Sequence, residues 1–169
     1  MSEFRPAFEH VLQWEGGYVD DPADSGGRTK FGISEAAHPE AWEDGPPSEA
    51  DVLRIYREEY WSHPRIKAGK IENQWIATYL FDAAVNHGPE NGAKMLQRAI
   101  RRSGGSCRED GWIGTNTRKA MRFLDPKLLM DRFVLMRVEF YRRIVERDGS
   151  QSRFLHGWLN RAMSVVNLW

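Results

Sequence analysis

Apolar residues recur every three or four positions along most of the chain, and this spacing constrains the fold more than any other feature of the sequence. The clearest run covers residues 126–147, where large apolar side chains lie at helical intervals (Leu128, Leu129, Phe133, Met136, Phe140 and Ile144). Such a stripe is typical of an amphipathic α-helix with one face in a core. No stretch alternates persuasively between apolar and polar residues, so the sequence predicts an all-α protein without strands.

Capping signals place the individual helices. Ser48 followed by Asp51 resembles a capping box that opens a helix through Tyr60, and Asp125-Pro126 predicts the start of the long helix. A first helix is expected to begin near Phe4 and to end at Gly16-Gly17, which places Glu15 in its last turn. Further helices are expected over residues 72–87, from Pro89 through Ile100, up to about Leu124, and in a last segment that holds Phe154 and Val166.

Residues 16–47 contain four of the eight prolines and show no sustained period, so they predict a long, structured, Gly/Pro-rich loop. A compact domain rarely keeps such a loop without a function for it. The Gly88-Pro89 step divides the chain into a lobe of residues 1–88 and a helical lobe of residues 89–169. We expect the two lobes to pack as one compact unit.

Charge and composition exclude several classes of protein. The 169 residues carry 24 basic and 24 acidic side chains, which argues against a nucleic-acid partner, and no apolar segment approaches the roughly 20 residues that span a bilayer. Residues 1–62 carry 5 basic and 14 acidic residues (−9) and residues 94–147 carry 14 and 6 (+8). Mutual packing or solvated helix faces explain this asymmetry more simply than an electrostatic partner does.

The single cysteine, Cys107, cannot form an intramolecular disulfide, and the five histidines lack metal-binding spacing. We therefore expect no metal and no cofactor. We also expect a monomer that is made in the cytoplasm and is not inserted into a membrane.

Residues 15–34 hold the densest group of reactive side chains: Glu15, then Asp20, Asp21 and Asp24. Cleavage of a glycosidic bond needs such a pair, an acid that protonates the leaving oxygen and a carboxylate that activates water or stabilises positive charge. The simpler alternative is a surface loop whose aspartates cap turns. A glutamate at the C-terminal end of a helix opposes the helix dipole, which favours the catalytic interpretation.

This stretch resembles glycoside hydrolase family 108, a family of lysozyme-like N-acetylmuramidases found in phage endolysins and bacterial genomes. The matching residues are Glu15-Gly16-Gly17-Tyr18-Val19, Asp21-Pro22, Asp24, Gly26-Gly27-x-Thr29 and Phe31-Gly32-Ile33-Ser34. Later segments also look like the family, including its C-terminal peptidoglycan-binding region: Tyr60-Trp61, Asp82-x-x-x-Asn86-x-Gly88, Leu96-Gln97, Asp110-Gly111-x-Ile113-Gly114 and Phe154-x-x-Gly157-Trp158-x-Asn160-Arg161.

The resemblance implies hydrolysis of the β-1,4 bond between N-acetylmuramic acid and N-acetylglucosamine in peptidoglycan glycan strands, with Glu15 as the acid. Phage lysozymes place an aspartate nine residues and a threonine fifteen residues after this glutamate, whereas this chain has Asp24 at nine and Thr29 at fourteen. Asp24 is thus expected to activate water or to stabilise positive charge, and Thr29 to position the water. Asp21, or no second carboxylate at all, stays an alternative for the role of Asp24.

Substrate contacts are expected from Tyr18, Trp61 and Trp112, whose rings suit the apolar faces of sugars, and from Asp21 and Asn86. Core packing is an equally good explanation for each aromatic residue. Asn86 is placed to bond an N-acetyl group or simply to cap its helix.

Two other functions fit the same residues. A lytic transglycosylase would cut the same bond with Glu15 alone, and a non-catalytic wall-binding or secretion-accessory protein would need neither carboxylate. As an endolysin, the protein would wait in the cytoplasm and reach the cell wall through a holin pore or a secretion system.

Overall fold

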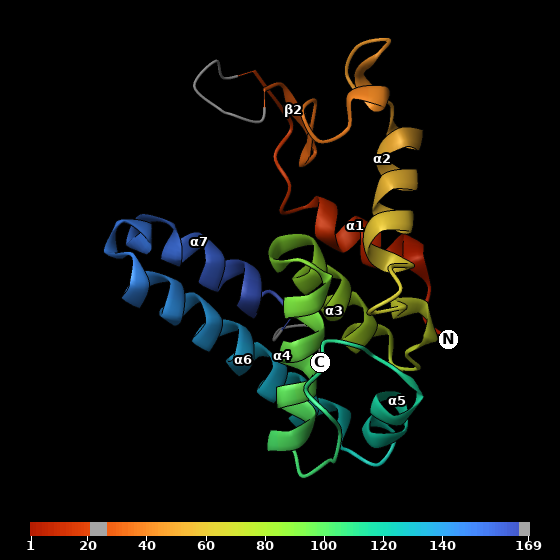
Figure 1. Cartoon of the computed structure of the whole chain (residues 1–169), viewed down its shortest axis with the longest axis vertical. Coiled ribbons are helices and arrows are strands. Elements are labelled where there is room, and N and C mark those ends of the chain that lie inside the picture. Colours follow the sequence, from red (N-terminus) through yellow and green to blue (C-terminus); the bar gives the residue numbers. More distant parts are fainter. Residues whose placement is uncertain (21–26, 166–169) are drawn as a thin grey trace.

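The computed structural model describes residues 1–20 and 27–165, and helices dominate it (Figure 1). The α-helices are α1 (Phe4–Leu12), α2 (Glu49–Ile55), α3 (Gln74–His87), α4 (Pro89–Arg102), α5 (Thr115–Met121), α6 (Pro126–Arg147) and α7 (Ser152–Met163). Shorter helical turns are η1 (Pro39–Trp42), η2 (Tyr56–Trp61), η3 (Ala68–Lys70) and η4 (Gly149–Gln151). The predicted all-α, lysozyme-like class is confirmed.

The loop that follows α1 contains three strands, which corrects the expectation of a chain without strands. They are β1 (Tyr18–Val19), β2 (Thr29–Lys30) and β3 (Ile33–Ser34), and they pair antiparallel in the order β1-β2-β3. Tyr18 lies opposite Lys30, and Lys30 lies opposite Ile33. Each strand has only two residues, which is too short for alternation to be visible in a sequence.

The helix starts predicted from the capping signals at Ser48 and Asp125 are confirmed. The Ser48 side chain accepts a hydrogen bond from the Asp51 backbone while Asp51 bonds back to the Ser48 backbone, which is a complete capping box. Asp125 caps α6 through the backbone N–H of Leu128. The helix that follows Ser48 is α-helical only as far as Ile55, and the next segment, η2, is π-helical.

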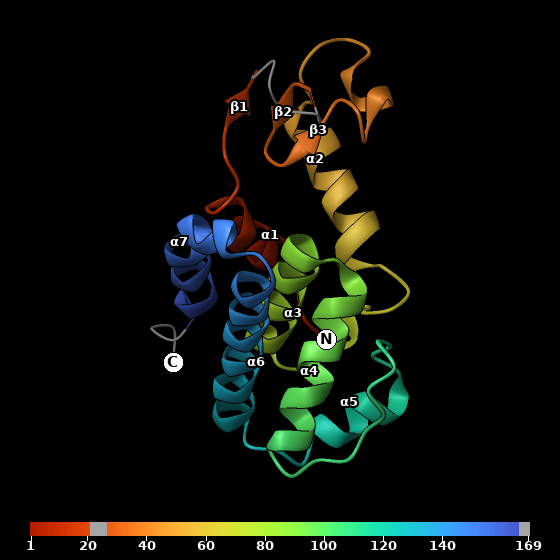
Figure 2. The same ribbon diagram turned by 60° about the vertical axis from the view of Figure 1, so that its left-hand side comes forward.

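Helix α3 lies at the centre of the molecule, and residues 76–84 of it are buried without interruption. Helices α1, α4 and α6 contact it, as the two ribbon views show (Figures 1 and 2). Gly92 of α4 makes one of these contacts possible, because a Cβ there would lie 3.1 Å from the backbone nitrogen of Ala84. The core thus joins residues of both lobes.

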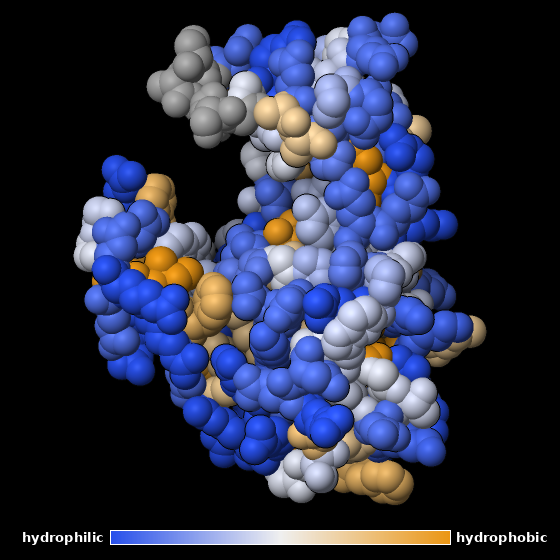
Figure 3. All heavy atoms as spheres, viewed as in Figure 1, coloured by the Kyte–Doolittle hydropathy of each residue, from blue (hydrophilic) through white to orange (hydrophobic). Residues whose placement is uncertain are grey.

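Helices α6 and α7 form an antiparallel hairpin on one side of α3 (Figure 2). The rings of Tyr141 and Trp158 stack between them with centroids 5.2 Å apart. In the space-filling view the surface is hollowed between this hairpin and the strand region, and apolar side chains line part of the hairpin (Figure 3). Within the described residues, no helix has the length and apolar composition needed to cross a membrane.

Candidate active site around Glu15

Glu15 lies beyond the end of α1, which corrects its expected place in the last helical turn. Helix α1 ends at Leu12, and the backbone N–H of Glu15 still donates to the carbonyl of Leu12 at 3.3 Å. Apolar spacing ends at Leu12, so the sequence had no periodic signal to fix the last three residues. The Glu15 side chain is only 16% exposed.

The turn between β2 and β3 brings backbone close to Glu15. Its two residues, Phe31 and Gly32, both have positive φ angles, +49° and +74°. A left-handed phenylalanine is rare, and here its carbonyl accepts a hydrogen bond from the Tyr56 hydroxyl at 2.9 Å. A Cβ on Gly32 would lie 2.9 Å from Oε2 of Glu15. Strain of this kind is common at functional sites.

Glu15 and Asn86 line the same cavity, of about 140 Å³, together with residues of the β2–β3 turn, of β3, α2, η2 and α3, and the residue that precedes η1. The remaining lining residues are Gly32, Ile33, His38, Ile55, Tyr56, Tyr60 and Val85. Burial raises the pKa of both Tyr56 and Tyr60, and the nearby Glu15 carboxyl adds to the effect, so both phenols stay neutral donors. The cavity therefore combines one carboxyl group with neutral hydrogen-bonding groups.

Asn86 has a fixed orientation. Its Oδ1 accepts a hydrogen bond from the hydroxyl of Tyr141 at 2.9 Å, and that hydroxyl in turn accepts from Nε of Arg137 at 3.0 Å. An amide whose oxygen is occupied offers its NH₂ group as a donor. Asn86 is thus arranged to donate to a carbonyl oxygen in the cavity.

A buried charge network lies behind Glu15. Asp82 of α3 is 1% exposed and pairs with Arg137 of α6 and Arg161 of α7. Nη2 of Arg161 also lies 2.9 Å from Oε1 of Glu15. Burial alone would raise the pKa of Asp82, but the two guanidinium groups hold this pKa below its ordinary value. Asp82 is therefore ionised at neutral pH.

Thr29 and Tyr18, two further residues singled out in the sequence, lie on the strands. Thr29 lies on β2, where its hydroxyl donates to the carbonyl of Gly27 at 3.3 Å, and Tyr18 on β1 is half-exposed and bonds Asp20. Neither of them lines the Glu15 cavity. Asp21 and Asp24 lie outside the described residues.

Trp61 is a core residue, which corrects its expected contact with a sugar. It is 7% exposed, and its ring packs 5.7 Å from Phe4 and 5.6 Å from Phe81, between centroids. Its ring is therefore mostly covered by core residues.

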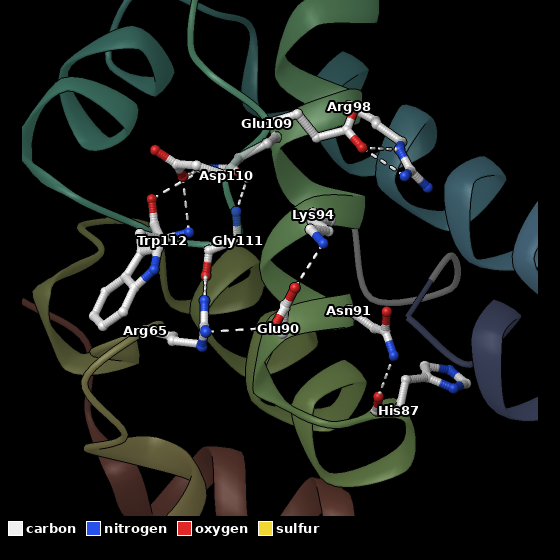
Figure 4. Close-up of polar contacts among 11 residues, drawn as sticks. Arg65, His87, Glu90, Asn91, Lys94, Arg98, Glu109, Asp110, Gly111 and Trp112 are labelled. Carbon is white, nitrogen blue, oxygen red and sulfur yellow. Dashed lines mark hydrogen bonds and ion pairs between the residues drawn. The ribbon is translucent and has the colours of Figure 1, made fainter.

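Trp112 is 48% exposed, and it lines a different cavity from Glu15, of about 610 Å³. The side chain of buried Gln97 holds its loop, because it donates to the carbonyl of Trp112 and to Asp110 and accepts from the N–H of Gly111. Figure 4 shows Arg65 beside the same loop, in contact with Glu90 and with the carbonyl of Gly111. The guanidinium of Arg65 lies 4.7 Å from the ring centre of Trp112. The structure therefore presents Trp112 as a fixed aromatic surface away from Glu15.

Sequence reasoning did not assign roles to Asp82, Arg137 and Arg161. A usable signal existed, since Asp82 is a charged residue in the middle of an apolar helix and such residues are almost never buried without a partner. The partners themselves are 55 and 79 residues away, so no local pattern could identify them. Among residues 1–20 and 27–165, no three His, Cys, Asp or Glu side chains gather as a metal site would require.

Two family models match successive parts of the chain. The family model for glycosyl hydrolase 108 matches residues 8–88, and the model described as a predicted peptidoglycan domain matches residues 91–163. No protein with a curated description matches.

A solved structure, SagA of Brucella abortus, is 30% identical in sequence with a TM-score of 0.71. The match covers 96% of this chain and 91% of SagA. Together, the shared fold, the identity along nearly the whole chain and the two adjoining family matches show that this protein belongs to glycoside hydrolase family 108 and carries a C-terminal peptidoglycan-binding region.

Proposed function

We propose that the protein is an N-acetylmuramidase that hydrolyses the β-1,4 bond between N-acetylmuramic acid and N-acetylglucosamine, with Glu15 as the general acid. The observation that carries the proposal is the shared cavity of Glu15 and Asn86. One side chain supplies a carboxyl group, and the other supplies an amide donor suited to an N-acetyl carbonyl.

In the proposed reaction, Glu15 gives its proton to the glycosidic oxygen while the bond from that oxygen to C1 breaks. The electron pair of the bond stays with the leaving sugar, which departs as an alcohol, and Glu15 becomes a carboxylate. Water then adds its oxygen to C1, and its proton goes to a carboxylate. We propose Asp24 for this last role, with Thr29 positioning the water and Asp21 as the alternative to Asp24.

Asn86 is proposed to recognise the substrate. Because Tyr141 occupies its oxygen, the NH₂ group is free to donate to an acetamido carbonyl beside the cleaved bond. Tyr18, half-exposed on β1 before the Asp21 segment, is proposed to contact a neighbouring sugar ring.

Trp112 is proposed to bind the glycan at a second place. Its fixed, half-exposed ring offers an apolar surface to a sugar face. The test uses Glu15→Gln as background, so that cleavage does not confuse binding, and measures sedimentation with insoluble peptidoglycan. Trp112→Ala should weaken binding about fivefold to tenfold. Phe123→Ala is the matched control, because Phe123 is 89% exposed and lines another cavity. Equal binding by both variants would refute the role of Trp112.

The central experiment is digestion of purified peptidoglycan, with mass spectrometry of the released fragments. The wild-type chain should release reducing muramic ends, and Glu15→Gln should lose activity by about 10²-fold or more. Glu43→Gln is the control, because it removes the same negative charge at an exposed position, and this variant should keep its activity. Asp24→Asn and Asp21→Asn identify the second carboxylate.

Release of anhydro ends by the wild-type chain would show that the protein cuts the same bond as a lytic transglycosylase and not as a hydrolase. No cleavage by folded protein on several wall types would overturn the proposal and leave a wall-binding protein.

We further propose that the protein acts as a monomer and as an endolysin that reaches the wall from the cytoplasm. The resemblance of its motifs to those of phage endolysins supports this role. Co-expression with a holin should lyse cells, expression without a pore should not, and light scattering of the purified protein should give the mass of one chain, 19.6 kDa. Lysis without any pore, or a larger mass, would contradict these proposals.

A further inference from the structure

The C-terminal lobe reaches directly into the environment of the catalytic glutamate. Arg161 belongs to α7, within the region that matches the peptidoglycan-binding model, yet its Nη2 lies 2.9 Å from Oε1 of Glu15. Its side chain is 9% exposed, and that of Glu15 is 16% exposed. Water screens the attraction between these two charges less than it screens a pair on the surface.

Asp82 holds the same guanidinium group. Nε of Arg161 donates to Oδ1 of Asp82 at 2.9 Å, and Nη2 lies 2.7 Å from that oxygen. Arg137 occupies the other oxygen of Asp82. Asp82 thus has both oxygens engaged by arginines, and its bond to Nε fixes where the Arg161 guanidinium lies.

Nη2 of Arg161 is placed between two acceptors without being aligned to either. It is close enough to pair with Glu15 and with Asp82, but neither contact has the geometry of a hydrogen bond within the described residues. A small rotation of the guanidinium would align it with one carboxylate or the other. The Nε bond keeps the group anchored to Asp82 in both cases.

We propose that Arg161 is a positioning residue for Glu15, that Asp82 sets the orientation of Arg161, and that the C-terminal lobe thereby completes the catalytic centre. This inference rests on the proposed role of Glu15 as the general acid. While Glu15 carries its proton, Arg161 is retained by Asp82. When Glu15 has given the proton to the leaving oxygen, the same guanidinium stabilises the carboxylate that is left.

Other groups also face Glu15 and must be kept constant in any test. Tyr56 and Tyr60 approach it from η2, and His38 lines the same cavity. His10 of α1 lies close enough to Asp82 and Arg161 for their charges to act on it. None of these residues is changed in the variants below.

The test compares three changes at or near Arg161 in the full chain. Arg161→Gln removes the charge and the fork, and Arg161→Lys keeps the charge but not the planar fork. Arg153→Gln is the matched control, because it removes the same charge from the same helix at an exposed position two turns away. Peptidoglycan digestion is measured from pH 4 to pH 9, with thermal unfolding as a check on folding.

Arg161→Gln should lower kcat tenfold or more, because Glu15 loses its fixed position. It should also move the alkaline fall of activity upward by about one pH unit, because the carboxylate has lost its cation. Arg161→Lys should lower kcat while leaving that fall near the wild-type pH. Arg153→Gln should match the wild type. An alkaline fall at the same pH in the Arg161→Gln and Arg153→Gln variants would overturn the proposal.

A second measurement does not depend on activity. Carbon NMR of labelled glutamates, with the Glu15 signal identified by its loss in Glu15→Gln, follows the ionisation of Glu15 directly. Arg161→Gln should shift that titration upward by about one pH unit. Asp82→Asn should shift it downward, because Arg161 then has only Glu15 to pair with; equal titrations in wild type and Arg161→Gln would refute the inference.

The two failures are distinguishable. A folded wild-type chain that does not cleave peptidoglycan refutes the proposed function, whereas the NMR titration decides whether Arg161 controls Glu15.

Discussion

Gly32→Ala tests whether the β2–β3 turn determines where the Glu15 carboxyl group lies. The new Cβ would lie 2.9 Å from Oε2 of Glu15 and 3.0 Å from the hydroxyl oxygen of Tyr56, whereas ordinary van der Waals contact begins at 3.4 Å. The carboxyl group must therefore move by about 0.5 Å, and the ion pair with Arg161 restricts its direction. Active-site displacements approaching 1 Å can cost up to about 10²-fold in rate.

The substitution also strains the backbone, because Gly32 has a φ of +74°. An alanine in this left-handed region costs about 1–2 kcal/mol of folding stability. Gly104→Ala is the matched control: its φ is +89°, and no atom lies within 4 Å of a Cβ built there. Both variants should lose similar stability, and only Gly32→Ala should lose activity.

Urea unfolding and peptidoglycan digestion of the two variants make the comparison. We expect stability losses of about 1–2 kcal/mol in each and a fall in kcat of about tenfold to 10²-fold in Gly32→Ala alone. Unchanged kcat in a folded Gly32→Ala protein would show that the contact with Glu15 has no part in catalysis.

Three further predictions concern stability. Burial, with the charge of Arg137, lowers the pKa of His87 to about 3, so the stability that neutral His87 contributes above pH 6.5 is lost as the pH falls toward 3. At pH 4 this loss is about 3 kcal/mol of unfolding free energy. In urea unfolding, His87→Gln should therefore lose correspondingly less stability than the wild type between pH 7 and pH 4. Gly92→Ala should cost about 1–3 kcal/mol, because its Cβ would press on the backbone of Ala84, and a melting temperature equal to wild type would contradict that packing. Ser48→Ala should cost about 1 kcal/mol through the lost cap of α2, and calorimetry showing no change would mean that the cap adds nothing.

Local chemistry explains which parts of the fold were predictable. Ser48 and Asp125 cap helices by bonding residues three positions away, so their signals lie within a short stretch of sequence. The strands β1 to β3 depend instead on pairing across a loop and were missed. Composition could not reveal that α1 ends at Leu12, before Glu15, because the apolar spacing gives no signal after Leu12.

The candidate site, like the fold, was predictable only in part. Glu15 and Asn86 were identified from the sequence, and the fold brings them to one cavity. Trp61 and Trp112 are the same residue type, yet one packs in the core and the other is half-exposed, a difference that tertiary contacts decide. Arg161 was found only in the structure, since its partner Asp82 is 79 residues away.

The buried Arg137–Asp82–Arg161 network limits how this protein can be recombined with others. Asp82 lies in the segment that matches the hydrolase model, and both arginines lie in the segment that matches the peptidoglycan domain. A chimera that joins the first segment to an unrelated wall-binding module would leave a buried carboxylate without its cations, at a cost of several kcal/mol. We therefore expect the two segments to be exchangeable only as one unit, and changes to wall specificity to be tolerated best at exposed positions such as Trp112, if that residue has its proposed role.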